Sequence, residues 1–520
     1  MPVAETITEP RPQPTNPRDT PQHEVAVIGA GLSGVGMGIA LRREGLDDFV
    51  ILERAAAVGG TWRDNTYPGV GVDIPAQAYQ FSYELKPDWS SVYARGAEVQ
   101  RYVEHCADRY GVRRHIRFES EVTERAWDSE HQLWRLKTPD GEVTARFVIS
   151  AIGPFVDPKP AQIPGLENFK GKVIQSARWD HDYDLTEKRV AIVGTGASAV
   201  QIIPKIAREV ARLDVYQRTP IWVAPKLNPR IPHFLQSLFR RIPAVQNTIR
   251  AGSAAGVEFT LIFMVVHHGR IPLVARGVEF LLGKVWYRLQ VPDRELRRKL
   301  TPAYDFGCKR PAVSNTYLRA FSRDNVELVT EPIRRVTKAG VESADGSLRE
   351  VDVLILATGF HLATDPENYR RTPVRGREGF DLADFYATER SVSYEGISMP
   401  MLPNHFIMFG PYGWTGGTWH TLVETTSTHI IRVIKEAKRR GAREVEVKPE
   451  AANRWTEFVR ERLGRSLWNT SNCGPANSYY FDRHGDTPFL RPTSSAQAHR
   501  AARSFPLEDY SFSEDATPSR

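Results

Sequence analysis

The stretch EVAVIGAGLSG, residues 24–34, decides the fold of the N-terminal part of the chain. A short apolar strand runs directly into G-x-G-x-x-G, whose glycines permit a tight turn, close approach of the backbone to a pyrophosphate and tight helix packing. A helix to about Gly45 and a second strand, FVILE, follow, and the strand ends in an acid that is placed to bind a ribose hydroxyl. The pattern predicts a dinucleotide site at Gly29, Gly31, Gly34 and Glu53.

The same strand–turn–helix pattern occurs a second time in RVAIVGTGASAVQ, residues 189–201, as G-x-G-x-x-A. It predicts a second dinucleotide site, in which the contacting residues are expected to be Thr195, Gly196 and Ser198. The next strand, LDVYQRTP, ends in Arg218 and Thr219 instead of an acid. An acid would repel a 2′-phosphate, whereas a guanidinium and a hydroxyl bind it, so we expect NADPH rather than NADH.

Composition places few other limits on the chain. Its 520 residues suggest about three domains, and 41% hydrophobic with 25% charged residues is ordinary for a globular protein. No apolar run of about 18 residues and no signal peptide are visible, and residues 1–22 and 513–520 are expected to be disordered tails. Cys106, Cys308 and Cys473 form no C-x-x-C pair, which argues against a disulfide framework, a zinc site or a dithiol centre. We therefore expect a reduced, cytoplasmic protein without a metal.

A second Gly-rich stretch, GGTWRDNTYPGVGVD at residues 59–73, follows the first dinucleotide motif. Its order, G-G-x-W, then Y-P-G, then Asp, resembles the flavin-side fingerprint of the type I Baeyer–Villiger monooxygenases. The paired glycines are expected to let the backbone lie against a flat ring system with no side chain between. The resemblance places at the flavin Gly60, Thr61, Trp62 and Asp73, and the later Tyr79 is expected to line the same pocket or to pack in the core.

Three further segments resemble this family, two of them with a departure. PGLENFKGKVIQSARWD, residues 164–180, matches the second fingerprint except that Gln175 replaces its histidine, so a hydrogen-bonding link between domains is expected and a titrating role is excluded. In FGCKRP, Lys309 corresponds to the lysine on the NADP 2′-phosphate and Arg310 to the arginine over the flavin. In SYYFDRHGD, Tyr479 stands where the family has a tryptophan in the nicotinamide and substrate pocket.

The resemblance implies an α/β fold with two Rossmann-like dinucleotide-binding domains, for FAD and NADP, and a helical insertion. The expected FAD-binding domain is 23–155 with 392–512, the NADP-binding domain is 156–222 with 305–391, and the insertion is 223–304. The implied reaction uses FAD, NADPH and O₂ to insert one oxygen beside the carbonyl of a small, lipophilic ketone, through a flavin peroxide. Arg310 would stabilise the anionic oxygen species, Asp73 would orient Arg310, and both are expected to be catalytic.

The expected insertion has an unusual surface pattern. Residues 225–310 contain 15 Lys/Arg and 5 Asp/Glu, and an apolar stripe in 271–290 consists of Val274, Val278, Leu281, Val285 and Leu289. Such a stripe is most often part of a core. Because basic residues surround it, a weak peripheral membrane contact is the alternative. The same charge could suit nucleic acid, but no nucleic-acid motif is present and none is expected as a partner.

Other enzyme classes share part of this pattern. A heteroatom monooxygenase acting on amines or sulfides would use the same two cofactors, and an NADPH oxidase or redox sensor would need both sites but no Arg310. The cysteine spacing excludes a dithiol reductase. Arg310 and the first fingerprint favour ketone oxygenation, whereas Gln175 and Tyr479 weaken that interpretation.

Overall fold

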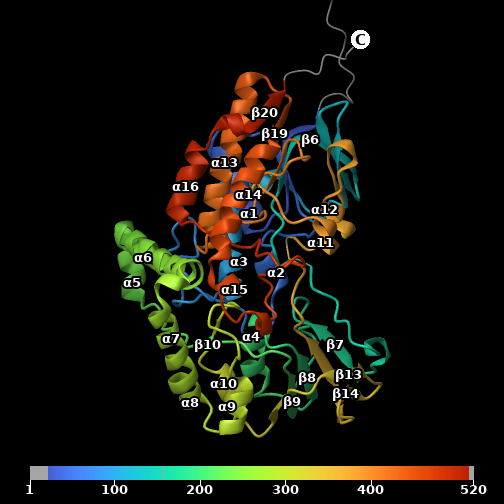
Figure 1. Ribbon diagram of the computed structural model, residues 1–520, viewed down its shortest axis with the longest axis vertical. Coiled ribbons are helices and arrows are strands. Elements are labelled where there is room, and N and C mark those ends of the chain that lie inside the picture. Colours follow the sequence, from blue (N-terminus) through green and yellow to red (C-terminus); the bar gives the residue numbers. More distant parts are fainter. Residues whose placement is uncertain (1–20, 156, 363, 514–520) are drawn as a thin grey trace, which may run out of the picture.

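The computed structural model describes residues 21–513, apart from 156 and 363, as two sheet-containing units stacked along the long axis of the molecule (Figure 1). Most of the two tails that were expected to be disordered, residues 1–20 and 514–520, therefore lies outside the described residues. The remaining tail residues are ordered: Gln22 N donates to Thr144 Oγ1 at 3.0 Å, and Ser513 ends a strand. For these few residues the expectation of disorder is wrong.

The first unit contains an eight-stranded sheet in the order β17-β4-β5-β6-β1-β2-β3, with β18 also paired to β6. The strand bounds are β1 His23–Ile28, β2 Phe49–Leu52, β3 Ile116–Arg117, β4 Glu124–Asp128, β5 Leu133–Thr138, β6 Gly141–Ser150, β17 Val374–Arg375 and β18 His405–Ile407. Strand β1 pairs in parallel with β2 and β6, with Val25 opposite Phe49 and Phe147. These strands are apolar without alternation because helices cover the sheet and leave both of its faces buried.

Two helices dominate this unit, α1 Leu32–Arg43 and α13 Trp419–Arg440, which pack against each other although they are far apart in the sequence. The third glycine of the first motif explains how α1 begins. A Cβ on Gly34 would lie 1.8 Å from the Gly29 carbonyl oxygen, so only glycine allows the helix to start this close to the strand. The unit also contains α2 Thr61–Asp64, α3 Gly96–Arg109, α14 Pro449–Gly464, α15 Leu467–Thr470, α16 Ser495–Ser504 and the hairpin β19 Glu444–Val447 with β20 Tyr510–Ser513.

The second unit contains a five-stranded parallel sheet in the order β12-β9-β8-β16-β7. Its strands are β7 Lys172–Gln175, β8 Arg189–Val193, β9 Arg212–Tyr216, β12 Val326–Val329 and β16 Val353–Leu356. Helix α4 Ala197–Ile206 follows β8, and a small antiparallel sheet consists of β13 Ile333–Val336, β14 Gly340–Ser343 and β15 Leu348–Glu350. Together the two sheets confirm the expected α/β class.

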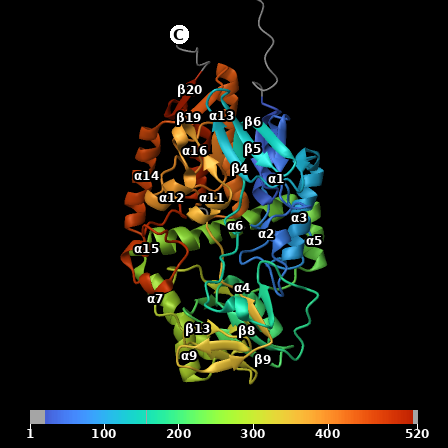
Figure 2. The ribbon, with the colours of Figure 1, turned by 90° about the vertical axis from the view of Figure 1, so that its right-hand side faces the viewer.

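Between β9 and β12 the chain leaves the second sheet and forms helices. They are α5 His233–Arg241, α6 Pro243–Leu261, α7 Pro272–Phe280, α8 Tyr287–Gln290, α9 Arg294–Leu300, α10 Tyr317–Ala320 and the π-helical segments η3 Ile262–Val266 and η5 Leu281–Trp286. The short strands β10 Val223–Ala224 and β11 Ala312–Val313 pair in parallel and bring the two ends of this helical segment together. Figure 2 shows α6 lying across the molecule between the two units.

Three expectations are wrong. The apolar stripe is not core, because four of its five members, all except Val278, are exposed. Residues 366–391 were expected in the second nucleotide domain, but β17 pairs with β4 of the first sheet, and α11 Pro366–Arg371 and α12 Leu382–Thr388 pack there. Cys308 and Cys473 form a disulfide, which sequence spacing could not indicate because the fold brings distant segments together.

Candidate functional site

A cavity of about 1550 Å³ lies between the two units and receives residues from both glycine motifs. Its wall includes the predicted residues Gly29, Gly31, Glu53, Gly60, Thr61, Trp62, Asp73, Tyr79, Thr195, Gly196, Ser198, Arg218, Thr219, Lys309 and Arg310. Gly34 alone among the predicted residues does not line it, because it packs beneath the first loop. Pockets for a single small ligand typically measure about 300–1,000 Å³, so this cavity is large enough for more than one.

Two glycine loops meet at the first end of the cavity. Gly29 has φ +98° and Gly60 has φ +53°, and a Cβ on Gly60 would lie 3.0 Å from the Cα of Gly31. The paired glycines of 59–73 thus allow close contact with the first glycine loop itself, a reason that differs from the flat ring expected on sequence. Gly59 N also donates to Ala30 O at 3.0 Å. The contact holds the N-terminal turn of α1 facing the cavity, where its free N–H groups suit an anion.

Glu53 lies at the end of β2, where the pattern places it, and is 3% exposed. Its Oε2 accepts from Ala30 N at 2.7 Å, and its Oε1 accepts from Arg63 Nη1 at 3.0 Å. These contacts fix the carboxylate beside the first glycine loop. Each carboxylate oxygen has more than one acceptor position, so a ribose hydroxyl can still bind at the cavity edge.

The predicted aromatic residues of this end contact each other. Trp62 Nε1 donates to Tyr79 Oη at 3.2 Å, and Tyr79 lies edge-on to the His420 ring at 4.7 Å. Burial raises the pKa of Tyr79 and lowers that of His420 well below its usual range, so both groups are neutral. His420 lies in the first turn of α13, and no sequence motif marks it. Thr418 caps this helix, and its Oγ1 accepts from Thr421 N at 3.2 Å.

The second glycine loop lies at the other end of the cavity. A Cβ on Gly194 would lie 2.5 Å from Ala357 O, whereas a Cβ on Gly196 would meet nothing within 4 Å. The first glycine therefore serves packing, and the second leaves open space above the N-terminus of α4, where a pyrophosphate fits. Thr195 Oγ1 donates to Thr219 O at 2.9 Å, which fixes the loop against the end of β9.

Two cations face this loop, and no ion pair involves either of them among the described residues. Burial, and then the nearby charge of Arg218, lower the pKa of Lys309. A neutral group lies against Arg218 instead: with the Asn477 amide assigned so that its oxygen faces the guanidinium, this oxygen accepts from Arg218 Nε at 3.2 Å and also from its Nη2. Two adjacent cations without a carboxylate form a site for a phosphate, which would offset their repulsion.

At the centre of the cavity, Arg310 and Asp73 form a bidentate ion pair across 237 positions of sequence. Arg310 Nε donates to Oδ2 and Nη2 to Oδ1, both at 2.8 Å, and each side chain keeps about a third of its surface exposed. Burial opposes the charge of Arg310, but Asp73, followed by the phenols of Tyr479 and Tyr480, outweighs it and raises the pKa. Arg310 is therefore a permanent cation with its guanidinium plane fixed and one edge open.

The stretch 59–73 connects the two units. Tyr67 Oη donates to Gln201 Oε1 of α4 at 3.2 Å, and Gln201 Nε2 donates back to Gly71 O at 3.0 Å. A Cβ on Gly69 would lie 2.7 Å from Gln201 O, so glycine is needed for this contact. Residues 59–73 thus contact the first glycine loop at their start, helix α4 in their middle and Arg310 at their end.

The two departures from the family pattern have different surroundings. Gln175 ends β7, and its Nε2 points to Lys159 O at 3.5 Å, within the connection between the units. Tyr479 packs edge-on to Tyr480, Phe489 and Phe155, with ring centres 4.7, 5.7 and 6.3 Å away. Its ring thus replaces the expected tryptophan in an aromatic wall of the cavity.

Comparisons with known proteins agree with this geometry. The family model described as pyridine nucleotide-disulphide oxidoreductase matches residues 26–259. A Baeyer-Villiger monooxygenase from Streptomyces coelicolor is 38% identical over 489 residues, which cover 94% of this chain and 92% of that protein. A Baeyer-Villiger monooxygenase from Pseudomonas aeruginosa is 40% identical over 463 residues, covering 89% of this chain and 86% of that protein.

Solved structures give the same result. A crystal structure of OTEMO in complex with FAD and NADP superposes with a TM-score of 0.83 at 28% identity, covering 95% of this chain and all of that one. Cyclohexanone monooxygenase from Rhodococcus sp. Phi1 bound to NADP⁺ superposes with a TM-score of 0.84 at 26% identity and the same coverage.

Proposed function

The chain belongs to the Baeyer–Villiger monooxygenases, and on this premise we propose that Arg310 is the cation on which its reaction depends. The enzyme is an NADPH-dependent FAD monooxygenase that inserts one oxygen atom of O₂ beside a ketone carbonyl to give an ester or lactone. Bound FAD, reduced by NADPH, supplies the activated oxygen. The Arg310–Asp73 pair at the centre of the cavity is the observation that supports this proposal.

The residues present fit both cofactors. The α1 turn, Gly29, Gly31 and Glu53 would hold the pyrophosphate and ribose of FAD, and Trp62 with Tyr79 would bound its ring system. The open space above Gly196 and the α4 turn would hold the pyrophosphate of NADPH. Arg218, Thr219 and Lys309 would bind its 2′-phosphate, because they provide two cations and a hydroxyl, and neither cation forms an ion pair with a carboxylate among the described residues.

Arg310 acts by charge and orientation. Oxygen insertion requires an anionic oxygen nucleophile, and negative charge then passes to the carbonyl oxygen of the ketone. A guanidinium that stays charged at every working pH stabilises both, and it costs no reorganisation because Asp73 already fixes its plane through two hydrogen bonds. Asp73 uses one edge of the guanidinium, so the Nη1 edge is left for the reacting oxygens.

The substrate part of this proposal is a lipophilic ketone. The cavity that contains Arg310 is lined in part by six aromatic side chains, which favour burial of an apolar substrate. The residues are Phe155, Phe360, Phe409, Trp414, Tyr479 and Phe489.

A ketone panel with mass-spectrometric product identification tests the proposal. NADPH oxidation under air should depend on the ketone and give a product with one added oxygen atom, with cyclic and aryl ketones oxidised faster than short polar ketones. Oxidation of an amine or sulfide panel without ketone products would instead identify a heteroatom oxygenase.

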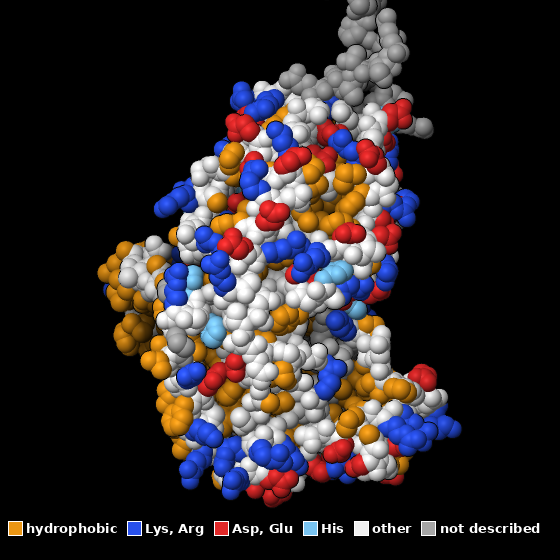
Figure 3. All heavy atoms as spheres, in the orientation of Figure 1, with side chains coloured by type: hydrophobic (Ala, Val, Ile, Leu, Met, Phe, Trp, Pro, Cys, Tyr) orange, Lys and Arg blue, Asp and Glu red, His pale blue; other side chains and the backbone are white. Residues whose placement is uncertain are grey.

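We also propose a weak peripheral contact of the helical insertion with an anionic membrane surface. Eleven of the 15 exposed large hydrophobic side chains of the described residues lie between Leu227 and Leu289. Figure 3 shows hydrophobic side chains gathered over α5, α6 and α7 at one edge of the molecule. Residues 223–304 also carry 13 Lys/Arg and 4 Asp/Glu, and such a basic, apolar surface complements anionic lipid headgroups.

A lateral contact fits this surface better than a span. Among the described residues, the helix Pro243–Val266 alone is long and apolar enough to cross a membrane, and a quarter of its apolar window is buried. Three polar contacts among the described residues attach α6 to the first unit: Gln246 Nε2 donates to Gln77 Oε1 at 2.9 Å and to Lys86 O at 2.6 Å, and Glu258 Oε1 accepts from Ser495 N at 2.9 Å. A helix attached in this way can offer only its outer face to lipid.

The proposed location is the cytoplasm, with the insertion reaching the inner membrane surface. For the domains, we propose an FAD-binding unit of 23–155 and 392–512 extended by residues 366–391, which pack on its sheet. The NADP-binding unit is then 156–222 with 305–365, interrupted by the insertion at 223–304.

A further inference from the structure

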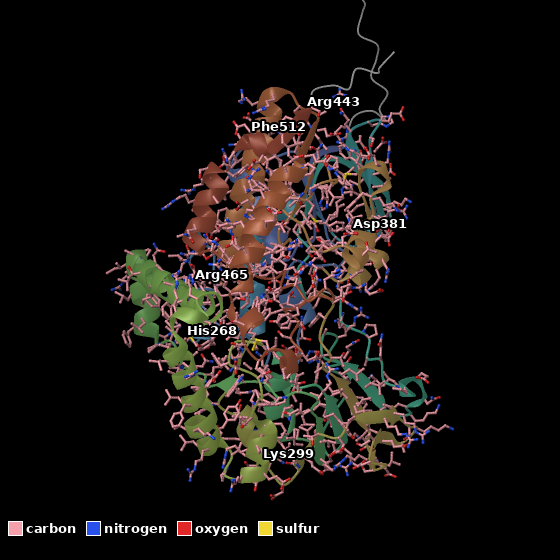
Figure 4. The ribbon with its side chains drawn as sticks, viewed as in Figure 1. His268, Lys299, Asp381, Arg443, Arg465 and Phe512 are labelled. Carbon is pink, nitrogen blue, oxygen red and sulfur yellow. A yellow bond between two sulfur atoms is a disulfide. The ribbon has the colours of Figure 1, made fainter. Side chains whose placement is uncertain are left out.

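The Cys308–Cys473 disulfide lies beside the phosphate-binding cations. Its two sulfurs belong to segments 165 residues apart, with the Cα atoms 5.0 Å from each other. Cys308 directly precedes Lys309 and Arg310, and Cys473 precedes the turn that ends at Asn477, the residue that holds Arg218. Figure 4 shows the sulfur–sulfur bond close to His268, where the insertion meets the C-terminal segment.

Few other interactions hold the two segments together at this point. Trp468 Nε1 donates to Gly307 O at 3.0 Å, and Asn472 donates through its backbone N to Asp305 Oδ2 at 3.3 Å and through its Nδ2 to Ala303 O at 3.1 Å. The disulfide is the covalent link between the segments that carry Lys309 and Asn477. Lys309 directly follows Cys308 and Asn477 is four residues after Cys473, so the disulfide joins the two segments that carry these residues.

We propose that Cys308 and Cys473 form a reversible thiol–disulfide site that sets the affinity of the enzyme for NADPH. The inference rests on the proposed role of Arg218 and Lys309 at the 2′-phosphate. In the disulfide form, Lys309 and the Asn477–Arg218 pair keep a fixed separation at the phosphate site. In the dithiol form, the 471–481 segment keeps its hydrogen bonds and its aromatic packing but loses the covalent link to Cys308, so the cations must be ordered further at the moment of binding, which weakens binding.

The redox step is an exchange with a small thiol pair. Reduction breaks the Sγ–Sγ bond: a dithiol gives two electrons and two protons, both cysteines become thiols, and the dithiol closes to its own disulfide. Oxidised glutathione reverses the step, because it accepts the two electrons and leaves as two thiols. Cys308 is fully buried and Cys473 is 2% exposed, so exchange needs opening of the 471–481 segment and is slower than for a surface disulfide. Disulfides that occur in cytosolic proteins are usually transient and serve catalysis or redox sensing.

NADH lacks the 2′-phosphate, so its KM distinguishes a change at the phosphate site from a general loss of order in the protein. The FAD-loaded enzyme is assayed for the KM of NADPH and of NADH after oxidised glutathione, after dithiothreitol, and as the C308S/C473S double variant. Reduction and the double variant should each raise the KM for NADPH about tenfold, within the usual range of coupling between sites, and leave the KM for NADH within twofold. Arg218→Ala in the same assay reports on the phosphate assignment itself.

The matched control is Cys106→Ser, which removes the remaining buried cysteine of the described chain and should change neither KM. Alkylation of the unfolded protein should modify one cysteine after glutathione treatment and three after dithiothreitol. Equal KM changes for the two nucleotides, or no change while Arg218→Ala is NADPH-selective, would overturn the switch alone. No selectivity from Arg218→Ala would overturn the phosphate assignment. Three modified cysteines after glutathione treatment would show that the bond does not form.

Discussion

Replacing Arg310 by alanine should abolish most of the ester formation while leaving both cofactors bound. The side chain provides a fixed cation, with both hydrogen bonds to Asp73 at 2.8 Å, at a site where about a third of its surface faces the cavity. Removing one preorganised donor from a developing oxyanion typically lowers kcat by about 10²–10³, or about 2.7–4 kcal/mol. Partial exposure favours the lower end of this range, because solvent screens part of the charge.

The assay measures NADPH oxidation, ester or lactone formation and hydrogen peroxide release on the FAD-loaded protein. Arg310→Ala should retain FAD and consume NADPH, but release the reduced oxygen as hydrogen peroxide instead of product. Arg310→Lys keeps the charge but loses the bidentate pair and should lie between the two. Arg390→Ala is a matched control, because Arg390 also pairs bidentately with an aspartate, Asp486, away from the cavity.

The reasoning about Arg310 is refuted if Arg310→Ala makes ester within threefold of the wild-type rate. It is also refuted if Arg310→Ala loses activity because it no longer binds FAD, since Arg310 would then serve cofactor binding and not the reaction. Asp73→Asn gives a further check. It keeps the size of the side chain and removes the charge that fixes the guanidinium, so product formation should fall by about tenfold, less than for Arg310→Ala.

Three further predictions follow from other residues. Because its pKa is lowered, Lys309 loses its proton at a lower pH than a free lysine, so the KM for NADPH should rise toward alkaline pH. Lys309→Arg should remove this rise, and a wild-type KM that does not depend on pH would contradict the prediction. Gln175→His should change coupled product only a few-fold, since the amide contacts a backbone carbonyl in the interdomain connection, and a large gain in coupling would show that the position must titrate. In vesicle flotation, Phe280→Ser with Leu281→Ser should reduce binding to anionic vesicles several-fold, whereas Leu348→Ser, at a similarly exposed site far from the insertion, should not; equal binding to neutral vesicles would exclude the charge-based contact.

The parts of the fold that the sequence predicts are those fixed by local backbone chemistry. Gly34 and Gly194 are needed because a Cβ would strike a neighbouring carbonyl, and such needs appear as motifs. The Arg310–Asp73 pair was accessible only through family resemblance, since nothing local relates residues 237 positions apart. Whether that pair carries the reaction stays a prediction.

Other features depend on tertiary contacts that leave no local pattern. The disulfide, the addition of β17 to the first sheet and the contact of Asn477 with Arg218 each join segments that are far apart in the sequence. The exposed apolar stripe of α7 and η5 shows a different limit of prediction from sequence. Periodicity identifies an apolar helix face correctly, but it does not say whether protein or another phase covers that face.

The connection made by residues 59–73 has a consequence for recombining members of this family. Because Tyr67 and Gly71 bond to Gln201, and Asp73 bonds to Arg310, the stretch belongs to one unit by sequence and to the other by contact. A chimera that exchanges only the NADP-binding unit would match this stretch against a foreign α4 helix and a foreign arginine loop. Exchanging residues 59–73 together with that unit would keep the contacts intact. The natural crossover points of this enzyme therefore do not coincide with its domain boundaries.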